Sequence, residues 1–366
     1  MQRTDAPTID RIDVSVYRIP TETPEADGTF TWDATTMVLV EARGGGECGI
    51  GYTYADEGTG QLIVDTLAEV VRGRNAMDVP AAWAAMVHII RNLGRPGVSS
   101  MGIAAVDVAL WDLKARLLGL PLVTLLGAAH DAAPVYGSGG FTTYSLDRLQ
   151  AQLAGWVEGG IPRVKMKIGT QPADDLSRVR AAREAIGPNA ELYVDANGAY
   201  SRKQALAQAE AFRECGVVWF EEPVSSDDLE GLNLIRNRAP AGMNIAAGEY
   251  GYDLWYFRRM LEAGAVDVLQ ADASRCAGIT GFLRVGPLTE SRSMNLSAHC
   301  APSLHVAACC ATQNIHPMEY FFDHARIEHM FFDGALTPVN GALRPNRTRP
   351  GLGLEFKRAD AGRFAV

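Results

Sequence analysis

Three acidic residues recur along the chain at intervals that suit one shared site. Asp195, Glu221 and Glu249 each follow a short apolar run and are 26 and 28 residues apart. Carboxylate oxygens without a neighbouring Cys or His favour Mg²⁺, which also accepts water and substrate oxygens as ligands. We therefore expect one Mg²⁺ ion per subunit at these three residues. Glu222 adjoins Glu221, and the sequence leaves the choice between them open, although Glu221 directly follows the apolar run.

Side chains suited to proton transfer accompany these carboxylates. Lys165 and Lys167 alternate along one extended segment, so both point to the same side of it. Lys167 can act as a neutral base if Lys165 and the metal lower its pKa. His299 can serve as the opposite acid or base, with Asp272 accepting its second ring N–H. Removing a proton beside a carboxylate creates a dianion, which a metal ion stabilises as a Lewis acid.

Repeated strand–helix units position these residues. Short apolar runs predict strands at residues 164–168, 191–194, 217–220, 245–247, 268–271 and 295–298, with helical patterns between them. A polar residue stands at the end of each run. Glu319 lies near a further predicted strand, which would be the eighth strand of the barrel. So many units predict parallel strands and favour a closed barrel over an open sheet. The carboxyl ends of barrel strands meet at one mouth, where we expect the polar side chains to converge. No glycine-rich dinucleotide fingerprint follows these strands, which argues against a Rossmann domain.

The first part of the chain has a different pattern. Alternating apolar residues predict strands near residues 12–16, 36–42 and 48–54, which form an antiparallel meander. Between the first two strands, residues 21–33 are expected to form a polar loop. Helical periodicity then extends from Gln61 to Leu118 and ends at prolines and glycines. The sequence thus predicts an α+β domain, followed by a second domain that starts near Pro134.

Charge and composition exclude several classes of partner. The 366 residues include 34 Lys and Arg against 43 Asp and Glu, a formal net charge of -9. This charge would repel nucleic acid and anionic membranes, so we expect neither as a partner. Residues 1–10 are polar and lack the apolar core of a signal peptide, and no run of about 18 apolar residues occurs. We therefore expect a cytoplasmic protein.

The cysteines show neither a metal-binding nor a disulfide spacing. There are six of them, at positions 48, 215, 276, 300, 309 and 310, with no CxxC motif. They are interpreted as buried thiols. A nucleophilic Cys300 beside His299 is the less favoured interpretation.

Taken together, these motifs resemble the enolase superfamily and, within it, the mandelate racemase subgroup. The matching segments are KMK at 165–167, VDANGAY from 194, WFEEP from 219, GE at 248–249, Asp272, His299, HPMEY with Glu319, and AAVDVALWDLKARLLGLPL from 104. The resemblance implies an α/β fold, a modified (β/α)₈ TIM-type barrel with an N-terminal α+β capping domain. It places the capping domain at residues 1–128 and the barrel at 129–330, with a segment at 331–366 that returns to the capping domain.

The resemblance also implies roles for individual residues. Asp195, Glu221 and Glu249 would be magnesium ligands. Lys167 and the His299–Asp272 pair would be the acid–base groups. Lys165 and Asn197 would contact substrate carboxylate or metal-bound oxygens, and Glu319 would hydrogen-bond a carboxylate oxygen. Loops near residues 21–33 and 52–60 would close over the pocket. Arg275 stands where many relatives carry Lys, which leaves the exact substrate open. A symmetric homo-oligomer is also implied.

Two reactions begin with the same proton abstraction from a small carboxylate substrate. A racemase or epimerase returns a proton from the opposite base, whereas an acid-sugar dehydratase uses His299 to protonate the departing β-hydroxyl. The lid sequence TETPEADGTFTWD is mostly polar, and we expect four polar residues, Arg275, Ser303, His305 and His324, near the barrel mouth, with Arg275 and His324 as substrate contacts. A polyhydroxylated acid needs such hydrogen-bond partners, so we favour dehydration.

Two further classes of protein are weighed against these enzymes. A pyridoxal phosphate enzyme with a Schiff base on Lys165 or Lys167 would not need three spaced carboxylates. A noncatalytic sugar-acid binding protein could keep the fold, but the complete set of metal and base positions argues against it.

Overall fold

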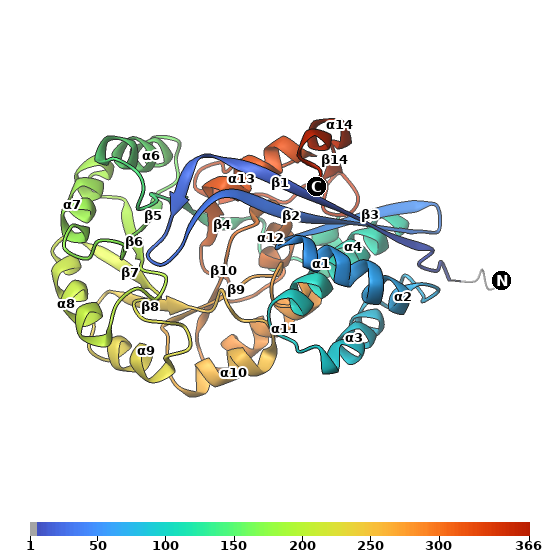
Figure 1. The fold of residues 1–366 in the computed structure, drawn as a ribbon, viewed down its shortest axis with the longest axis horizontal. Helices are drawn as coiled ribbons and strands as arrows, with labels where there is room; N and C mark the ends of the chain where they lie inside the picture. Colours follow the sequence, from blue (N-terminus) through green and yellow to red (C-terminus); the bar gives the residue numbers. More distant parts are fainter. Residues whose placement is uncertain (1–5) are drawn as a thin grey trace.

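A computed structural model describes residues 6–366, and it contains a small α+β part beside a larger barrel (Figure 1). Eight parallel strands form the nearly closed barrel, and helices surround it. The predicted fold class is therefore confirmed. Of the segment 1–10 that we interpreted as lacking a signal peptide, residues 1–5 lie outside the described part. None of the helices within residues 6–366 is long and apolar enough to cross a membrane.

The capping part is a three-stranded antiparallel sheet covered by helices. The strands are β1 (Arg11–Ala26), β2 (Thr31–Gly44) and β3 (Glu47–Tyr54), and the helices are α1 (Glu57–Leu62), the π-helical η1 (Ile63–Leu67), α2 (Ala68–Val71), α3 (Val79–Ile89), the 3₁₀ turn η2 (Ile90–Asn92) and α4 (Val98–Leu117). Helix α4 packs closely on β3 because Gly51 has no side chain: a Cβ there would lie 2.3 Å from the Ala105 carbonyl oxygen. The predicted meander is confirmed.

The expected loop at residues 21–33 is largely a hairpin instead. Strand β1 continues to Ala26 and β2 begins at Thr31, so only residues 27–30 form the turn. The Asp27 carboxylate accepts the backbone N–H groups of Thr29 and Phe30, at 2.6 and 2.7 Å. The prediction was wrong because the polar residues of this edge hairpin resemble a loop in sequence, although Glu25 and Ala26 pair with Trp32 and Thr31 beyond an irregularity at residues 21–24. Figure 1 shows this hairpin reaching across the barrel.

The barrel strands follow one another in chain order around the sheet. They are β4 (Ala133–Gly139), β5 (Arg163–Lys167), β6 (Glu191–Asp195), β7 (Val217–Glu221), β8 (Asn244–Ala247), β9 (Val268–Ala271), β10 (Asn295–Ala298) and β11 (Met318–Phe321). Strand β11 pairs in parallel with β4, which brings the last strand beside the first. The predicted strands coincide with β5 to β10 to within a residue.

Helices precede, separate and follow these strands and form the outer layer. They are α5 (Leu122–Leu126), α6 (Leu146–Glu158), α7 (Asp175–Ile186), α8 (Arg202–Arg213), α9 (Leu229–Arg236), α10 (Leu254–Glu262), α11 (Gly278–Glu290), α12 (Pro302–Cys310) and α13 (Phe322–Phe331). Inside the barrel, the rings of Tyr193 and Trp219 stack with centroids 5.0 Å apart, and Tyr136 packs against both. These rings fill part of the barrel core, and Lys165 lies over one of them, with Nζ 5.4 Å from the centre of the Tyr136 ring.

The chain after α13 contacts the capping sheet. It includes β12 (Phe332–Asp333), β13 (Ala342–Leu343), β14 (Glu355–Phe356), α14 (Arg358–Ala361) and the 3₁₀ turn η3 (Gly362–Phe364). Arg358 forms an ion pair with Glu41 of β2 at 2.5 Å, and the Phe356 ring lies 5.7 Å from that of Tyr17. The division into domains at residues 128 and 330 remains a prediction.

Candidate active site

Three buried carboxylates meet at the carboxyl ends of adjacent barrel strands. Asp195 ends β6 and pairs in register with Glu221, which ends β7, and Glu249 follows β8. One oxygen from each lies within 4.8 Å of the others. The Oε2 atom of Glu249 has no hydrogen-bond partner among residues 6–366, although it is buried. His299 Nε2 lies 3.4 Å from this oxygen, beyond the distance of a normal hydrogen bond. A buried oxygen without a hydrogen bond in an all-carboxylate group fits a hard divalent cation such as Mg²⁺.

Two lysines from β5 contact this group of carboxylates. Lys165 Nζ lies 2.5 Å from Glu221 and 3.4 Å from Asp195, and Lys167 Nζ lies 2.5 Å from Asp195 Oδ2. Burial raises the pKa of Glu221, and the neighbouring Asp195 raises it further, to about 8. The cluster therefore resists a further negative charge, and a cation would relieve that repulsion.

The pKa of Lys167 differs from the sequence-based expectation. Burial lowers it, but the carboxylates of Asp195, Glu249 and Glu319 together outweigh burial, so the pKa is raised above its ordinary value. Lys165 does lower it, as expected, but the effect of this second ammonium group is smaller than that of Asp195. The expectation considered the positive neighbours and omitted the carboxylate that pairs with Lys167 across the strands.

His299 and Asp272 form the expected pair on the other side of the site. His299 Nδ1 lies 2.8 Å from Asp272 Oδ2, while Ser274 donates to the other carboxylate oxygen from its backbone and its hydroxyl, at 2.7 Å each. Burial lowers the pKa of His299, but the nearby Glu249 and Glu319 carboxylates outweigh it and raise that pKa. The ring therefore holds a proton more readily than an isolated histidine would.

Glu319 lies between the lysines and the histidine. Its Oε1 atom is 2.8 Å from Lys165 Nζ and accepts the Ser138 hydroxyl at 2.6 Å. Its Oε2 atom accepts the backbone N–H of Cys300 at 3.0 Å. Burial raises the pKa of Glu319, but Lys165 and His299 lower it well below its usual value, so the side chain is an ionised acceptor in the ligand-free chain.

The remaining predicted substrate contacts line the same cavity. Asn197 follows Asp195 and its backbone N–H donates to that carboxylate at 2.9 Å, while its own buried Oδ1 has no partner in the described part of the chain. Arg275 lies 3.3 Å from the Glu249 carboxylate. The ring of His324 stacks on Tyr54 with centroids 3.4 Å apart, and burial lowers the pKa of this histidine to about 3. His324 is therefore a neutral group.

Ser303 and His305 do not reach the mouth, in contrast to our expectation. Both are buried in α12 and are not among the residues that line the cavity. His305 Nε2 accepts the backbone N–H of Ala273 at 2.7 Å, and the Ser303 backbone N–H donates to Glu328 at 2.9 Å. These residues support the loops below the site. Helix α12, which follows β10, directs both side chains into the interior. The sequence alone does not reveal which way the helix faces.

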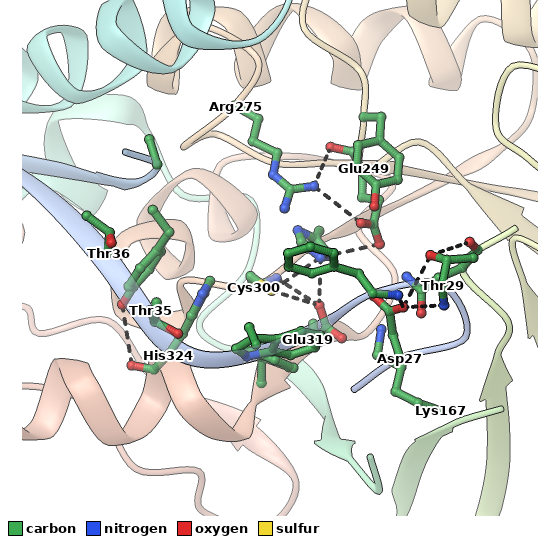
Figure 2. A pocket seen from close by; sticks show the side chains of 18 of the residues that line it. Asp27, Thr29, Thr35, Thr36, Lys167, Glu249, Arg275, Cys300, Glu319 and His324 are labelled. Atoms are coloured by element: carbon green, nitrogen blue, oxygen red, sulfur yellow. Dashed lines mark hydrogen bonds and ion pairs between the residues drawn. The ribbon is translucent and has the colours of Figure 1, made fainter. Parts of the chain in front are cut away.

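The cavity has a volume of about 350 Å³ and lies under the β1–β2 hairpin. Figure 2 shows Thr35 and Thr36 at the left of the cavity and Asp27 and Thr29 at the right, with Glu249 above and Lys167 below. Five aromatic side chains also line it, namely Phe30, Trp32, Tyr54, Tyr250 and Phe321. The lid is thus less polar than expected, because Phe30 of the turn and Trp32 of β2 both line the cavity. The Asx-turn sequence DGTF could have indicated that Phe30 lies at a hairpin tip.

Glu222 lies beside the three-carboxylate group but is not part of it. Its backbone has a φ of 36°, and its buried Oε1 lacks a hydrogen-bond partner among residues 6–366. Burial and the adjacent Glu249 raise its pKa well above the usual value. Of the two adjacent glutamates, Glu221 is therefore the one that the structure groups with Asp195 and Glu249.

Comparison with family models matches nearly the whole chain. Residues 11–127 match the model described as mandelate racemase / muconate lactonizing enzyme, N-terminal domain, and residues 148–361 match the enolase C-terminal domain-like model. Among curated relatives, L-talarate/galactarate dehydratase of Salmonella typhimurium is 31% identical, with 96% of this chain and 90% of the relative covered. The 3,6-anhydro-alpha-L-galactonate cycloisomerase of Streptomyces coelicolor is also 31% identical, with 98% and 99% covered.

Solved structures agree with this assignment. A mandelate racemase/muconate lactonizing enzyme-like protein from Rubrobacter xylanophilus is 57% identical and superposes with a TM-score of 0.96, covering 98% of this chain and 100% of that one. A racemase from Streptomyces coelicolor with bound magnesium is 30% identical, with a TM-score of 0.92 and the same coverage. These similarities extend over both the capping part and the barrel.

Proposed function

Because this chain belongs to the mandelate racemase/muconate lactonizing enzyme family of the enolase superfamily, we propose that it dehydrates an acid sugar to a 2-keto-3-deoxy acid. The observation that carries the proposal is that Lys167 and His299 line one cavity, each held by a buried aspartate, on either side of a carboxylate triad. That arrangement offers a base and an acid to one bound substrate.

The three carboxylates are the groups that would hold Mg²⁺. Asp195, Glu221 and Glu249 would bind the ion, which when bound supplies the positive charge that stabilises a substrate dianion. Lys165 and Asn197 would orient the substrate carboxylate. Glu319 would contact a carboxylate oxygen, and to donate a hydrogen bond there it would take up a proton as the anionic substrate enters.

The reaction transfers two protons. A cation held by Asp195 would offset the carboxylate that raises the pKa of Lys167, so that Lys167 can lose its proton. Neutral Lys167 then removes the proton on the carbon beside the carboxylate, and protonated His299 gives its Nε2 proton to the hydroxyl on the next carbon. The C–O bond breaks, water leaves, and the resulting enol tautomerises to the 2-keto acid. Lys167 ends protonated and His299 neutral, and exchange with solvent restores both groups.

Two features support an acid sugar as the substrate. Arg275, Asn197 and the hydroxyl groups of Thr29 and Thr35 provide hydrogen-bonding groups around the cavity. The curated relatives also include an enzyme named L-talarate/galactarate dehydratase, which is similar over most of its length. We also expect a cytoplasmic homo-oligomer that binds neither nucleic acid nor membrane.

A racemase or epimerase is the second candidate. The aromatic residues Phe30 and Trp32, whose rings stack with centroids 6.1 Å apart, give the lid an apolar face that would suit a less polar hydroxy acid. One similar structure is that of a protein described as a racemase, from Streptomyces coelicolor. In that reaction Lys167 and His299 would exchange protons with the same carbon from opposite sides.

A substrate screen distinguishes these functions. The magnesium-loaded protein is incubated with a library of mono- and diacid sugars and aryl hydroxy acids, and 2-keto product and incorporation of deuterium from D₂O are measured. Keto product supports dehydration, whereas deuterium at the α-carbon without keto product supports racemisation or epimerisation. A Lys167→Ala/His299→Ala double variant is the control. Binding without either reaction would indicate a noncatalytic sugar-acid binding protein.

A further inference from the structure

A second group of donor atoms lies in the same cavity, beside the carboxylate triad. His299, Cys300 and Glu319 are buried, and all three line the cavity. His299 Nε2 lies 3.2 Å from Cys300 Sγ and 3.5 Å from Glu319 Oε2, and Sγ lies 3.3 Å from the same oxygen. Figure 2 shows Cys300 and Glu319 joined by these contacts. One nitrogen, one sulfur and one oxygen therefore converge within a small triangle.

The backbone after β10 creates this convergence. In a regular strand, neighbouring side chains point to opposite faces, so His299 and Cys300 could not approach a common point. Cys300 instead has a φ of 54° and Ala301 a φ of 39°, both in the left-handed region. This costly conformation brings the thiol to the same side as the imidazole. It therefore distinguishes Cys300 from an ordinary buried cysteine.

The spacing of the three atoms suits a tetrahedral ion. With zinc bonds of about 2.0–2.3 Å to nitrogen, oxygen and sulfur, tetrahedral angles place ligand atoms about 3.4–3.6 Å apart. The distances of 3.2, 3.3 and 3.5 Å approach those values before any ion is bound. Three protein ligands leave a fourth position for water or a substrate oxygen.

Two of the three ligands are already oriented by other groups. Histidines that bind metals usually give their other ring N–H to a carboxylate, and His299 Nδ1 lies 2.8 Å from Asp272. The other oxygen of Glu319 is held by Ser138 and Lys165. Mg²⁺ prefers oxygen ligands, whereas a thiolate selects softer ions such as Zn²⁺.

We propose that His299, Cys300 and Glu319 form a binding site for a thiophilic divalent cation such as Zn²⁺, and that the bound cation inhibits the enzyme. Binding forms bonds to His299 Nε2, Cys300 Sγ and Glu319 Oε2, and the protons on Nε2 and on the thiol leave to solvent. The ion is then bound to His299 Nε2, the atom whose proton would otherwise go to the departing hydroxyl. The inhibition rests on the proposed function, whereas the binding does not.

Cobalt spectroscopy tests the binding directly. Co²⁺, a spectroscopic probe for zinc sites, is titrated into the full-length protein in the presence of excess Mg²⁺. We expect one equivalent to produce a thiolate-to-cobalt charge-transfer band that Zn²⁺ abolishes. Zn²⁺ or Co²⁺ at the all-oxygen group of Asp195, Glu221 and Glu249 would give no such band. Absence of the band in the unmodified protein would overturn the proposal, whether or not any variant folds.

Two cysteine variants identify the sulfur. Cys300→Ser should lose the band, and Cys48→Ser should keep it, because Cys48 is the partly exposed thiol and lies in the capping sheet. Cys300→Ala gives a second test should the serine variant fail to fold. A band that persists in a folded Cys300 variant would place the ion elsewhere and overturn the proposal.

Turnover provides an independent measurement. At a Zn²⁺ concentration ten times its dissociation constant, the activity of the unmodified enzyme should fall about elevenfold. A chelator should restore the activity, and additional Mg²⁺ should not. Cys300→Ser should show less than a twofold loss relative to its own zinc-free rate. Failure to find any substrate would remove the proposed function but leave the cobalt result in place; a cobalt band without inhibition would refute the proposed inhibition alone.

Discussion

The Nζ atom of Lys167 lies 2.5 Å from the Oδ2 atom of Asp195, so a candidate base and a candidate metal ligand share one contact. This contact links the charge of the base to the metal site. A cation held by Asp195 draws on the same carboxylate that raises the pKa of Lys167. The metal and the proton are therefore coupled through one buried side chain.

Magnesium should stabilise the folded protein through this group of carboxylates. At a Mg²⁺ concentration of 100 times the dissociation constant, the free energy of unfolding should rise by about 2.7 kcal/mol. Asp195→Asn should lose most of that gain because it removes one of three charged ligands. Thermal melts with Mg²⁺ and with a chelator measure the effect. Glu230→Gln, at a side chain that is 91% exposed, is the control and should respond like the unmodified protein. Equal Mg²⁺ responses in Asp195→Asn and the unmodified protein would show that the ion binds elsewhere.

The contact between Asp272 and His299 should matter for turnover more than for stability. The asparagine in Asp272→Asn can donate to His299 Nδ1 and thereby stabilise the wrong tautomer, so we expect kcat to fall about 10²-fold or more. Steady-state kinetics and a circular dichroism melt are measured on the same preparation. An unchanged kcat in a folded variant would remove His299 from the proposed acid role. Ser274→Ala, which removes only one support of the aspartate, should have a smaller effect.

A buried carboxyl group between the capping domain and the barrel should make stability depend on pH. Burial raises the pKa of Asp107 in α4 to about 7, while its oxygens accept the backbone N–H and hydroxyl of Thr280 in α11 at 2.9 and 2.6 Å. Its contribution to stability is fully present below the unfolded-state pKa near 3.8 and is lost as the pH rises through about 7.

The Asp107→Asn variant tests this contribution, because the amide does not titrate and can still pair with Thr280. Between pH 5 and pH 7 the free energy of unfolding should fall by about 2 kcal/mol less in the variant than in the unmodified protein. Chemical denaturation at both pH values provides the comparison. Glu25 and Glu328, whose pKa values burial raises to about 8 and about 7, still titrate in both proteins. Identical pH profiles would show that Asp107 is ionised throughout.

The barrel and its strand ends were predictable because two independent signals agree in the sequence. Short apolar runs recur at the length of a strand–helix unit, and a polar residue follows each run, as Asp195 and Glu221 do. Parallel strands bring their carboxyl ends to one side, so pairs such as His299 and Asp272 could be expected to meet without knowledge of loop structure.

The lid and the loop after β10 could not be predicted in the same way. At the end of the hairpin, Glu25 and Ala26 pair with Trp32 and Thr31 through the backbone, and such pairing leaves little trace in side-chain hydrophobicity. The turn at Cys300 and Ala301 has positive φ angles that neither residue type favours, and it decides which side chains of α12 face inward. The burial of Ser303 and His305 and the position of the Cys300 thiol could therefore be learned only from the structure.

Proton NMR of the magnesium-loaded protein with acid sugars in D₂O tests the central claim, that Lys167 removes the proton beside the carboxylate. For at least one acid sugar, the unmodified protein should remove the α-proton and form a 2-keto-3-deoxy product. Lys167→Ala should lower both rates by about 10²- to 10⁴-fold while retaining the fold. Equal rates in a folded Lys167→Ala variant, or a substrate whose α-proton survives turnover by the unmodified enzyme, would contradict the account.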